Sequence, residues 1–206
     1  MTGWTRAEGP VAVLPQENID TDQLIPARFM STPRSEGYGQ FLLHDFLRNE
    51  TAPKIEGAEV LIAGRNFGCG SSREAAVYAL VDFGIRAVLA PSFGDIFASN
   101  AVNNGLLPAQ IGDDLAARLL AQPPARMAVD IAAGILAFDD GEHPFALDET
   151  WRMKLIKGWD DIDMTAQHGA AIGAFAAQRR RAHAWAWPAA TGTDTDLGTT
   201  GRGASG

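Results

Sequence analysis

Cysteine is almost absent from this sequence, because Cys69 is the single cysteine in 206 residues. One thiol cannot form an intrachain disulfide, and such scarcity is typical of a reducing compartment, so we expect a cytoplasmic protein. One thiol is also too few for an iron–sulfur cluster, which is normally held by about four protein thiolates. The four histidines show no i, i+4 pair of the kind that binds metals. We therefore expect no metal ligands in this chain.

Long apolar runs are also missing. No stretch approaches the ~18 apolar residues of a membrane span, and the first ten residues, MTGWTRAEGP, lack the apolar core of an export signal. Basic residues are outnumbered, since 25 Asp and Glu against 17 Lys and Arg give a net charge of −8. A basic cluster, Arg179–Arg181, lies near the end of a helical pattern, where it suits the helix dipole. We expect a soluble protein that binds neither membrane nor nucleic acid.

Apolar residues make up 46% of the chain, enough for a sizeable core. Runs rich in Val, Leu and Ile predict strands at 11–14, 60–63, 87–90, 127–132, 135–139 and 144–147. Helical periodicity covers 72–83, with Gly84 as its stop, and 95–104, 148–157 and 161–182. This alternation predicts an α/β fold class, with a mixed sheet flanked by helices in one domain over residues 1–188. The Gly/Thr/Asp-rich tail, residues 189–206, is expected to be disordered.

A glycine-rich segment, residues 63–74 (AGRNFGCGSSRE), connects a buried strand to a helix. It does not fit a dinucleotide-binding turn, because Arg73 stands where the third glycine should be. A P-loop needs Gly-Lys-Ser/Thr, which is missing, and no Gly-x-Ser-x-Gly elbow is present. Two interpretations stay open. Ser71 and Glu74 have the spacing of a helix capping box, or the serines and Arg73 form a catalytic, anion-binding helix start.

Several motifs in this chain resemble one family. Residues 68–74 (GCGSSRE) resemble the GSSRE signature of the swivelling domain of the aconitase superfamily. Residues 18–26 (NIDTDQLIP) resemble the NxDTDxIIP motif of isopropylmalate isomerase small subunits. Residues 90–97 (APSFGDIF), 104–108 (NGLLP) and 167–168 (QH) are similar to the same family, in the same order. The resemblance covers roughly residues 10–185 and implies a single swivelling β/β/α domain of aconitase type.

The resemblance implies roles for five residues. Ser71 is expected to be the base that removes a C–H proton, and Ser72 and Arg73 are expected to bind a substrate carboxylate. Asp22 is expected near the cluster and partner, although an acidic turn residue would serve there too. Arg34 lies in the loop that shapes substrate choice and is expected to contact the substrate, with an exposed loop arginine as the alternative.

The implied function is that of a small subunit of a heteromeric hydro-lyase. Such an enzyme isomerises 2-isopropylmalate and 3-isopropylmalate by dehydration and rehydration in leucine biosynthesis. The resemblance places a 4Fe–4S cluster on a large subunit, with which this chain would form a heterodimer or heterotetramer. Many members carry histidine where this chain has Ala75, which leaves the substrate open to a related malate such as 2-methylmalate/citraconate. A non-catalytic RNA-binding relative is the alternative of another class.

Overall fold

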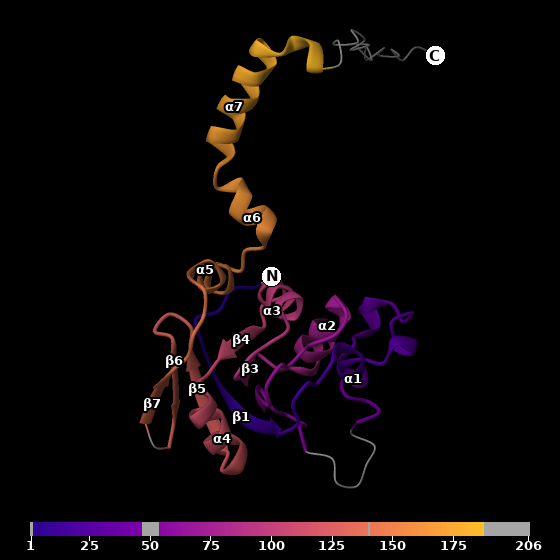
Figure 1. Cartoon of the computed structure of the whole chain (residues 1–206), viewed down its shortest axis with the longest axis vertical. Helices are drawn as coiled ribbons and strands as arrows, with labels where there is room; N and C mark the ends of the chain where they lie inside the picture. The colour runs from indigo at the N-terminus through magenta and orange to yellow at the C-terminus, as the bar shows by residue number, and fades with distance from the viewer. Residues whose placement is uncertain (1, 47–53, 140, 188–206) are drawn as a thin grey trace, which may run out of the picture. The chain divides into compact units, whose positions relative to one another are not determined.

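The computed structural model describes residues 2–46, 54–139 and 141–187, and the chain divides into two compact units, Met1–Met164 and Thr165–Gly206. The first unit is an α/β domain that carries every predicted site residue (Figure 1). The described part of the second unit contains the end of α6 (Asp161–Ala166), then α7 (Gly169–Ala182) and a 3-10 helix at Ala184–Ala186. The predicted disordered tail, residues 189–206, lies outside the described residues.

The first unit is built on one seven-stranded sheet of order β4-β3-β2-β1-β5-β6-β7. Strands β1 to β4 pair in parallel, and β1, β5, β6 and β7 pair antiparallel. The predicted mixed α/β sheet is therefore confirmed. The strands are β1 (Arg6–Leu14), β2 (Val60–Ala63), β3 (Ala87–Ala90), β4 (Leu107–Gln110), β5 (Arg126–Asp130), β6 (Ile135–Phe138) and β7 (Gly141–Pro144).

Strand β1 joins the parallel and antiparallel halves of the sheet. Its first half, residues 6–10, pairs antiparallel with β5, and its second half, residues 11–14, pairs in parallel with β2. In Figure 1, β5, β6 and β7 lie on one side of the domain and α1 and α2 on the other. Because β1, β2 and β3 run in parallel, their carboxyl ends lie at the same end of the sheet.

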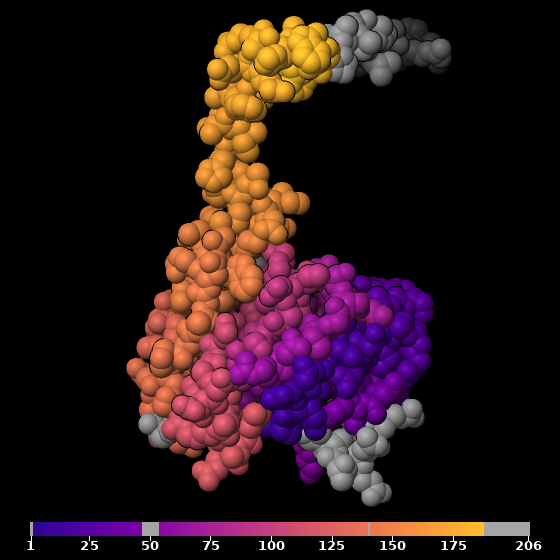
Figure 2. Space-filling model, viewed as in Figure 1, coloured from indigo at the N-terminus to yellow at the C-terminus, as the bar shows by residue number. Residues whose placement is uncertain are grey.

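Helices cover both faces of the parallel strands, which explains why β2 is buried along its whole length. Leu61 and Ala63 belong to a core cluster with α2 (Glu74–Phe83) and α3 (Asp95–Asn103). Val60 and Ile62 point to the opposite face and pack with α4 (Asp113–Ala121) and α5 (Glu149–Lys157). The space-filling view shows the N-terminal segments, in indigo, packed closely against the magenta α2–α3 region (Figure 2).

Other boundaries differ from the sequence-based prediction. The predicted strand at 144–147 was wrong, because the strand is Gly141–Pro144 and Ala146 makes only an isolated bridge with Gln110. Strand β4 and helix α4 were not predicted. Pro108 lies within β4, and a proline is tolerated there because β4 is an edge strand of the sheet. The predicted helix at 161–182 is divided into α6 (Asp161–Ala166) and α7.

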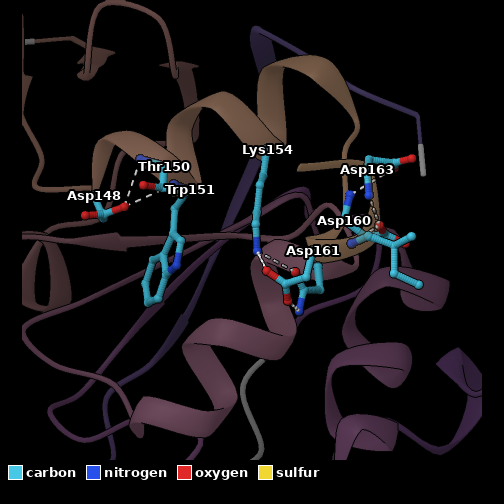
Figure 3. A network of polar contacts seen from close by, with 9 residues as sticks. Asp148, Thr150, Trp151, Lys154, Asp160, Asp161 and Asp163 are labelled. Carbon is cyan, nitrogen blue, oxygen red and sulfur yellow. Dashed lines mark hydrogen bonds and ion pairs between the residues drawn. The ribbon is translucent and has the colours of Figure 1, made fainter. Parts of the chain in front are cut away.

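A buried lysine fastens α5 to α3. Lys154 is only 5% exposed, and its ammonium donates to Oδ1 of Asn103 (3.1 Å) and pairs with Asp161. The hydrogen bond from Lys154 lowers the pKa of the Asp161 carboxyl from its usual value. Figure 3 shows this pair together with Asp148, whose carboxylate accepts two backbone N–H groups at the start of α5. Because a buried ammonium needs such partners, the contact holds α5 against the C-terminal end of α3.

The loop after β2 passes very close to α3 at Gly68. This glycine has a φ of +73°, and a Cβ atom placed there would lie 2.1 Å from Cγ of Phe97. A side chain at this position would meet both a strained backbone and the aromatic ring. The loop can therefore lie against α3 only with glycine at position 68.

We predict that Gly68→Ala destabilises the fold much more than Gly57→Ala. Gly57 has nearly the same φ, +74°, but nothing lies within 4 Å of its added Cβ. Gly57→Ala should cost about 1–2 kcal/mol from backbone strain alone, and Gly68→Ala about 1–3 kcal/mol more from overpacking. Urea unfolding followed by tryptophan fluorescence measures both. Equal losses for the two variants would contradict the close packing of Gly68 on Phe97.

Candidate active site

Four of the five predicted site residues, Asp22, Ser71, Ser72 and Arg73, gather where the parallel strands β1 and β2 end, whereas Arg34 contacts later turns of α2. The segment after β1 runs beside the glycine-rich loop after β2 and is held to it by backbone hydrogen bonds. Gly68 N–H donates to the carbonyl of Ile19 (2.7 Å), and Thr21 N–H donates to the carbonyl of Cys69 (3.0 Å). Two motifs that lie about fifty residues apart in the sequence thus form one surface. Carboxyl ends of parallel strands are where α/β proteins bind ligands.

The third motif, residues 90–97, supports the loop from its other side. Phe67 N–H donates to the carbonyl of Ser92 (3.1 Å), and Gly94 N–H donates to the carbonyl of Phe67 (2.9 Å). The Phe67 ring is fully buried and makes edge-to-face contacts with Phe93 and Phe97. This aromatic cluster supports the glycine-rich loop where it leaves the carboxyl end of β2.

Two asparagines at the base of the site adopt left-handed backbone conformations. Asn18 has a φ of 57° and Asn66 a φ of 60°. The side-chain amide of Asn66 donates to Oδ1 of Asn18 (2.8 Å), and the Asn66 N–H donates to Oγ of Ser92 (2.9 Å). Asparagine tolerates this backbone conformation better than most residues. Through these hydrogen bonds, Asn66 links the loop after β2 to the segment after β1 and to the segment after β3.

Ser71 is exposed, and its hydroxyl contacts a threonine rather than the helix. Its Oγ lies 3.2 Å from Oγ1 of Thr21. The Arg73 N–H donates to the Ser71 carbonyl (2.8 Å), so a turn precedes the helix. Helix α2 therefore begins at Glu74, two residues later than predicted, with Arg73 at the N-cap and no side-chain cap. The capping-box interpretation of Ser71 and Glu74 was wrong.

The capping box in this region belongs to α1 (Thr21–Leu24). The Asp20 carboxylate accepts the Gln23 N–H (2.7 Å), and the Gln23 side chain accepts the Asp20 N–H (2.8 Å). Asp20 rather than Asp22 therefore satisfies the backbone at this turn.

Asp22 forms an ion pair with Arg73. The Arg73 side chain is 25% exposed and that of Asp22 is 56% exposed, so the pair lies at the surface beside Ser71 and Ser72. Helix α1 lies beside α2 in Figure 1. The ion pair brings together two residues that sequence analysis assigned to different roles, and it leaves Arg73 facing a carboxylate.

Arg34 lies against the next turns of α2. Its guanidinium carbon is 3.4 Å from the centroid of the Tyr78 ring, and Nη2 is 3.1 Å from Oδ1 of Asp82. The Tyr38 N–H donates to the other Asp82 oxygen (2.9 Å). Burial, followed by the contact with Glu74, raises the pKa of the Tyr78 hydroxyl. The loop that contains Arg34 is thus fastened to the helix that begins after Arg73.

Ser71 also borders a hollow of about 200 Å³. Its lining consists of residues 68–71 and 94–97, and Ile96 in this lining is 55% exposed. Cys69 lies in the same wall, with its thiol 3.5 Å from the Asn18 carbonyl. Burial, followed by the charge on Asp20, raises the pKa of the Cys69 thiol, which keeps it neutral. Ala75, the second residue of α2, points into the core and is buried there.

Residues 2–46, 54–139 and 141–187 bring together no group of three or more His, Cys, Asp or Glu side chains that could hold a metal ion. In the same ranges no helix has the length and apolarity needed to cross a membrane.

Thr21 is the site residue that sequence analysis missed. It lies between the two aspartates of the Asp-Thr-Asp motif, yet it is buried and contacts Ser71. The available signal was a hydroxyl residue three and four positions before the apolar residues Leu24 and Ile25, on the same face of a helical turn. That signal does not identify a partner fifty residues away.

Comparisons with known proteins identify the family of this chain. The model of the aconitase C-terminal domain family matches residues 36–114. The 3-isopropylmalate dehydratase small subunit of Rhodospirillum centenum is 40% identical over 203 residues, covering 90% of this chain and 99% of the relative. The small subunit of the same name from Shewanella sp. strain ANA-3 is 39% identical over 195 residues, covering 86% and 97%.

A solved structure shows the same fold. The crystal structure of 3-isopropylmalate dehydratase from Methanocaldococcus jannaschii superposes with a TM-score of 0.63 at 25% identity, covering 82% of this chain and 98% of that one. The sequence matches, the shared fold and the assembled motifs agree. This chain belongs to the family of 3-isopropylmalate dehydratase small subunits, in the aconitase superfamily.

Proposed function

We propose that this chain is the small subunit of a hydro-lyase that interconverts 2-isopropylmalate and 3-isopropylmalate by dehydration and rehydration. The observation that carries the proposal is that Ser71, Arg73 and Asp22 lie together at the carboxyl ends of the parallel strands, in a chain of this family. The role belongs to leucine biosynthesis.

Ser71 would act as the base. Its hydroxyl is exposed at the rim of the hollow and is not used to cap α2. It is thus available to take a proton from a substrate carbon, and to return one in the reverse direction. The position directly before a helix start also favours negative charge on this oxygen.

Arg73 and Ser72 would bind a substrate carboxylate. The guanidinium presents a planar fork that matches two carboxylate oxygens, and the first N–H groups of α2 lie beside it. In the structure the Arg73 guanidinium is paired with the Asp22 carboxylate, which supports the idea that Arg73 is placed to meet a carboxylate. A substrate carboxylate would compete with Asp22 for this position.

Arg34 would contact the far end of the substrate. Its guanidinium is held by Asp82 and by the face of Tyr78, so it has a defined position on the α2 side of the site. A held arginine of this kind discriminates between substrates better than a free one.

The large subunit would complete the site. We infer that the large subunit carries a 4Fe–4S cluster. Such a cluster is normally held by about four protein thiolates, and this chain has one cysteine, Cys69. When bound, such a cluster supplies a Lewis-acidic iron for the departing hydroxyl. Asp22, on the exposed side of the Arg73 pair, would face that partner. We further propose a heterodimer or heterotetramer in the cytoplasm.

Ser71→Ala tests the proposal. In the enzyme reconstituted with the large subunit, we expect turnover to fall by about 10²–10⁴-fold, with little change in KM. The melting temperature should stay the same, because the hydroxyl caps no helix. Ser72→Ala is the matched comparison, and it should raise KM more than it lowers turnover. Near-normal turnover of Ser71→Ala on every malate offered, including 2-methylmalate, would refute the base assignment.

Arg73→Lys tests the carboxylate clamp. One ammonium cannot reproduce two parallel N–H···O bonds, so KM should rise by a factor equivalent to about 2–3 kcal/mol. Arg65→Gln is the control, since Arg65 lies in the same loop and pairs with an aspartate of another element, Asp113. That control should keep its KM. Both variants are assayed at saturating large subunit, which removes any defect in subunit binding. An unchanged KM for Arg73→Lys would show that Arg73 does not bind the substrate.

A further inference from the structure

Thr21 is one of two polar or charged side chains that are buried among the described residues, the other being Lys154. It is 2% exposed, and it lies at the first position of α1. Its N–H is bonded to the loop through the Cys69 carbonyl (3.0 Å). The hydroxyl is thus held in place by backbone on one side and by the core on the other, and it cannot turn out to solvent.

The Thr21 hydroxyl reaches two atoms of one residue. Its Oγ1 lies 3.2 Å from the Ser71 carbonyl oxygen and 3.2 Å from Ser71 Oγ. A hydroxyl carries one proton and accepts through its lone pairs. The carbonyl can only accept, so in the resting site Thr21 donates to the carbonyl while the Ser71 hydroxyl donates to Thr21 Oγ1. This arrangement directs the Ser71 proton toward the buried Thr21 and leaves the Ser71 lone pairs outside that contact.

The arrangement must change when Ser71 is deprotonated. An alkoxide has no proton to donate, so the Thr21–Ser71 contact persists only if Thr21 turns its own proton from the carbonyl to Oγ. That O–H···O⁻ bond is charge-assisted and roughly twice as strong as a neutral one. The rotation moves only one hydrogen, because the two acceptors are equally distant from Oγ1.

We propose that Thr21 is a positioning residue for Ser71 that redirects its hydroxyl proton from the Ser71 carbonyl to the Ser71 alkoxide. The inference rests on the proposed function of Ser71 as the base. The Ser71 proton first leaves to water. The alkoxide then takes the proton of the substrate C–H bond, whose electron pair forms the C=C bond, while the hydroxyl leaves the adjacent carbon as hydroxide with the electron pair of the broken C–O bond. The proton that Ser71 released neutralises this hydroxide, so one water is the product. In rehydration Ser71 gives its proton to the carbon that lost the hydroxyl, hydroxide from water adds to the carbon that lost the proton, and the remaining water proton restores the Ser71 hydroxyl.

The surrounding charges make this donor important. The titratable and charged groups around Ser71 are Asp20, Asp22, Cys69, Arg73, Glu74 and Asp95. The carboxylates among them outnumber the one guanidinium, and that guanidinium is already paired with Asp22. Their combined field opposes a new negative charge on Ser71. A directed hydrogen bond from Thr21, together with the start of α2, offsets this opposition.

The test compares Thr21→Val, Thr21→Cys and Thr21→Ser in the two-subunit enzyme at saturating large subunit. Valine keeps the shape and removes the hydroxyl, cysteine offers a weak donor, and serine keeps the hydroxyl. We expect valine to lower kcat by about tenfold to hundredfold, as for one lost hydrogen bond to a charged group, with KM changed little. The kcat–pH profile should move to higher pH. Serine should restore most of kcat, and cysteine should fall between.

A second arm repeats Thr21→Val in the Ser71→Ala background, where it should not lower the residual rate further. Circular dichroism and melting temperature identify any variant that does not fold, and the cysteine and serine variants then carry the comparison. Normal kcat and an unshifted pH profile for valine, or equal losses for valine and serine, would overturn the role of Thr21. If Ser71→Ala is inactive while Thr21→Val is normal, only this inference fails. If Ser71→Ala is fully active, the proposed function fails and this inference with it.

Discussion

The parallel pairing of β1 with β2 is the interaction on which the site depends. Four residue pairs set the register of the two strands, and the same alignment continues beyond the sheet as the bridge between Asp20 and Cys69. The continuation places the residues after β1 against the loop after β2, which brings Thr21 to Ser71. A shift of one residue in this register would turn the side chains to the opposite faces and would separate the motifs. The proposed positioning of the base and the proposed binding of a carboxylate would therefore both depend on one strand pair.

The site combines a closely packed supporting loop with an exposed surface that carries the candidate residues. Gly68 packs against Phe97, and the Phe67 ring is buried, so the loop has little freedom. Above it, Ser71 and Ser72 are exposed, and Arg73 is paired with an aspartate of its own chain. An enzyme with its whole active site in one chain would enclose these groups to exclude water. Their exposure fits a chain that contributes part of a site, with the remainder supplied by the large subunit.

Local sequence predicted three of the four parallel strands, β1 to β3, and placed the candidate residues Ser71 and Arg73 at a helix start, because buried apolar runs and a glycine-rich turn are local signals. It failed where geometry depends on distant contacts. The helix start moved from Ser72 to Glu74 because a turn closed by the Ser71 carbonyl precedes it. Strand β4 was missed because Pro108 is tolerated only at a sheet edge. Thr21 and the Asp22–Arg73 pair could not be found, since both arise from strand register.

The account is tested most directly by reconstitution from separately purified subunits, with iron, sulfide and isopropylmalate isomerisation measured before and after mixing. We predict that this chain alone contains neither iron nor sulfide and is inactive. Activity should appear on mixing with a cluster-bearing large subunit and saturate when the subunits are equimolar. Two results would contradict the claim that this chain contributes the base and the large subunit contributes the cluster. One is stoichiometric iron and sulfide in the isolated chain, and the other is a large subunit that is fully active by itself.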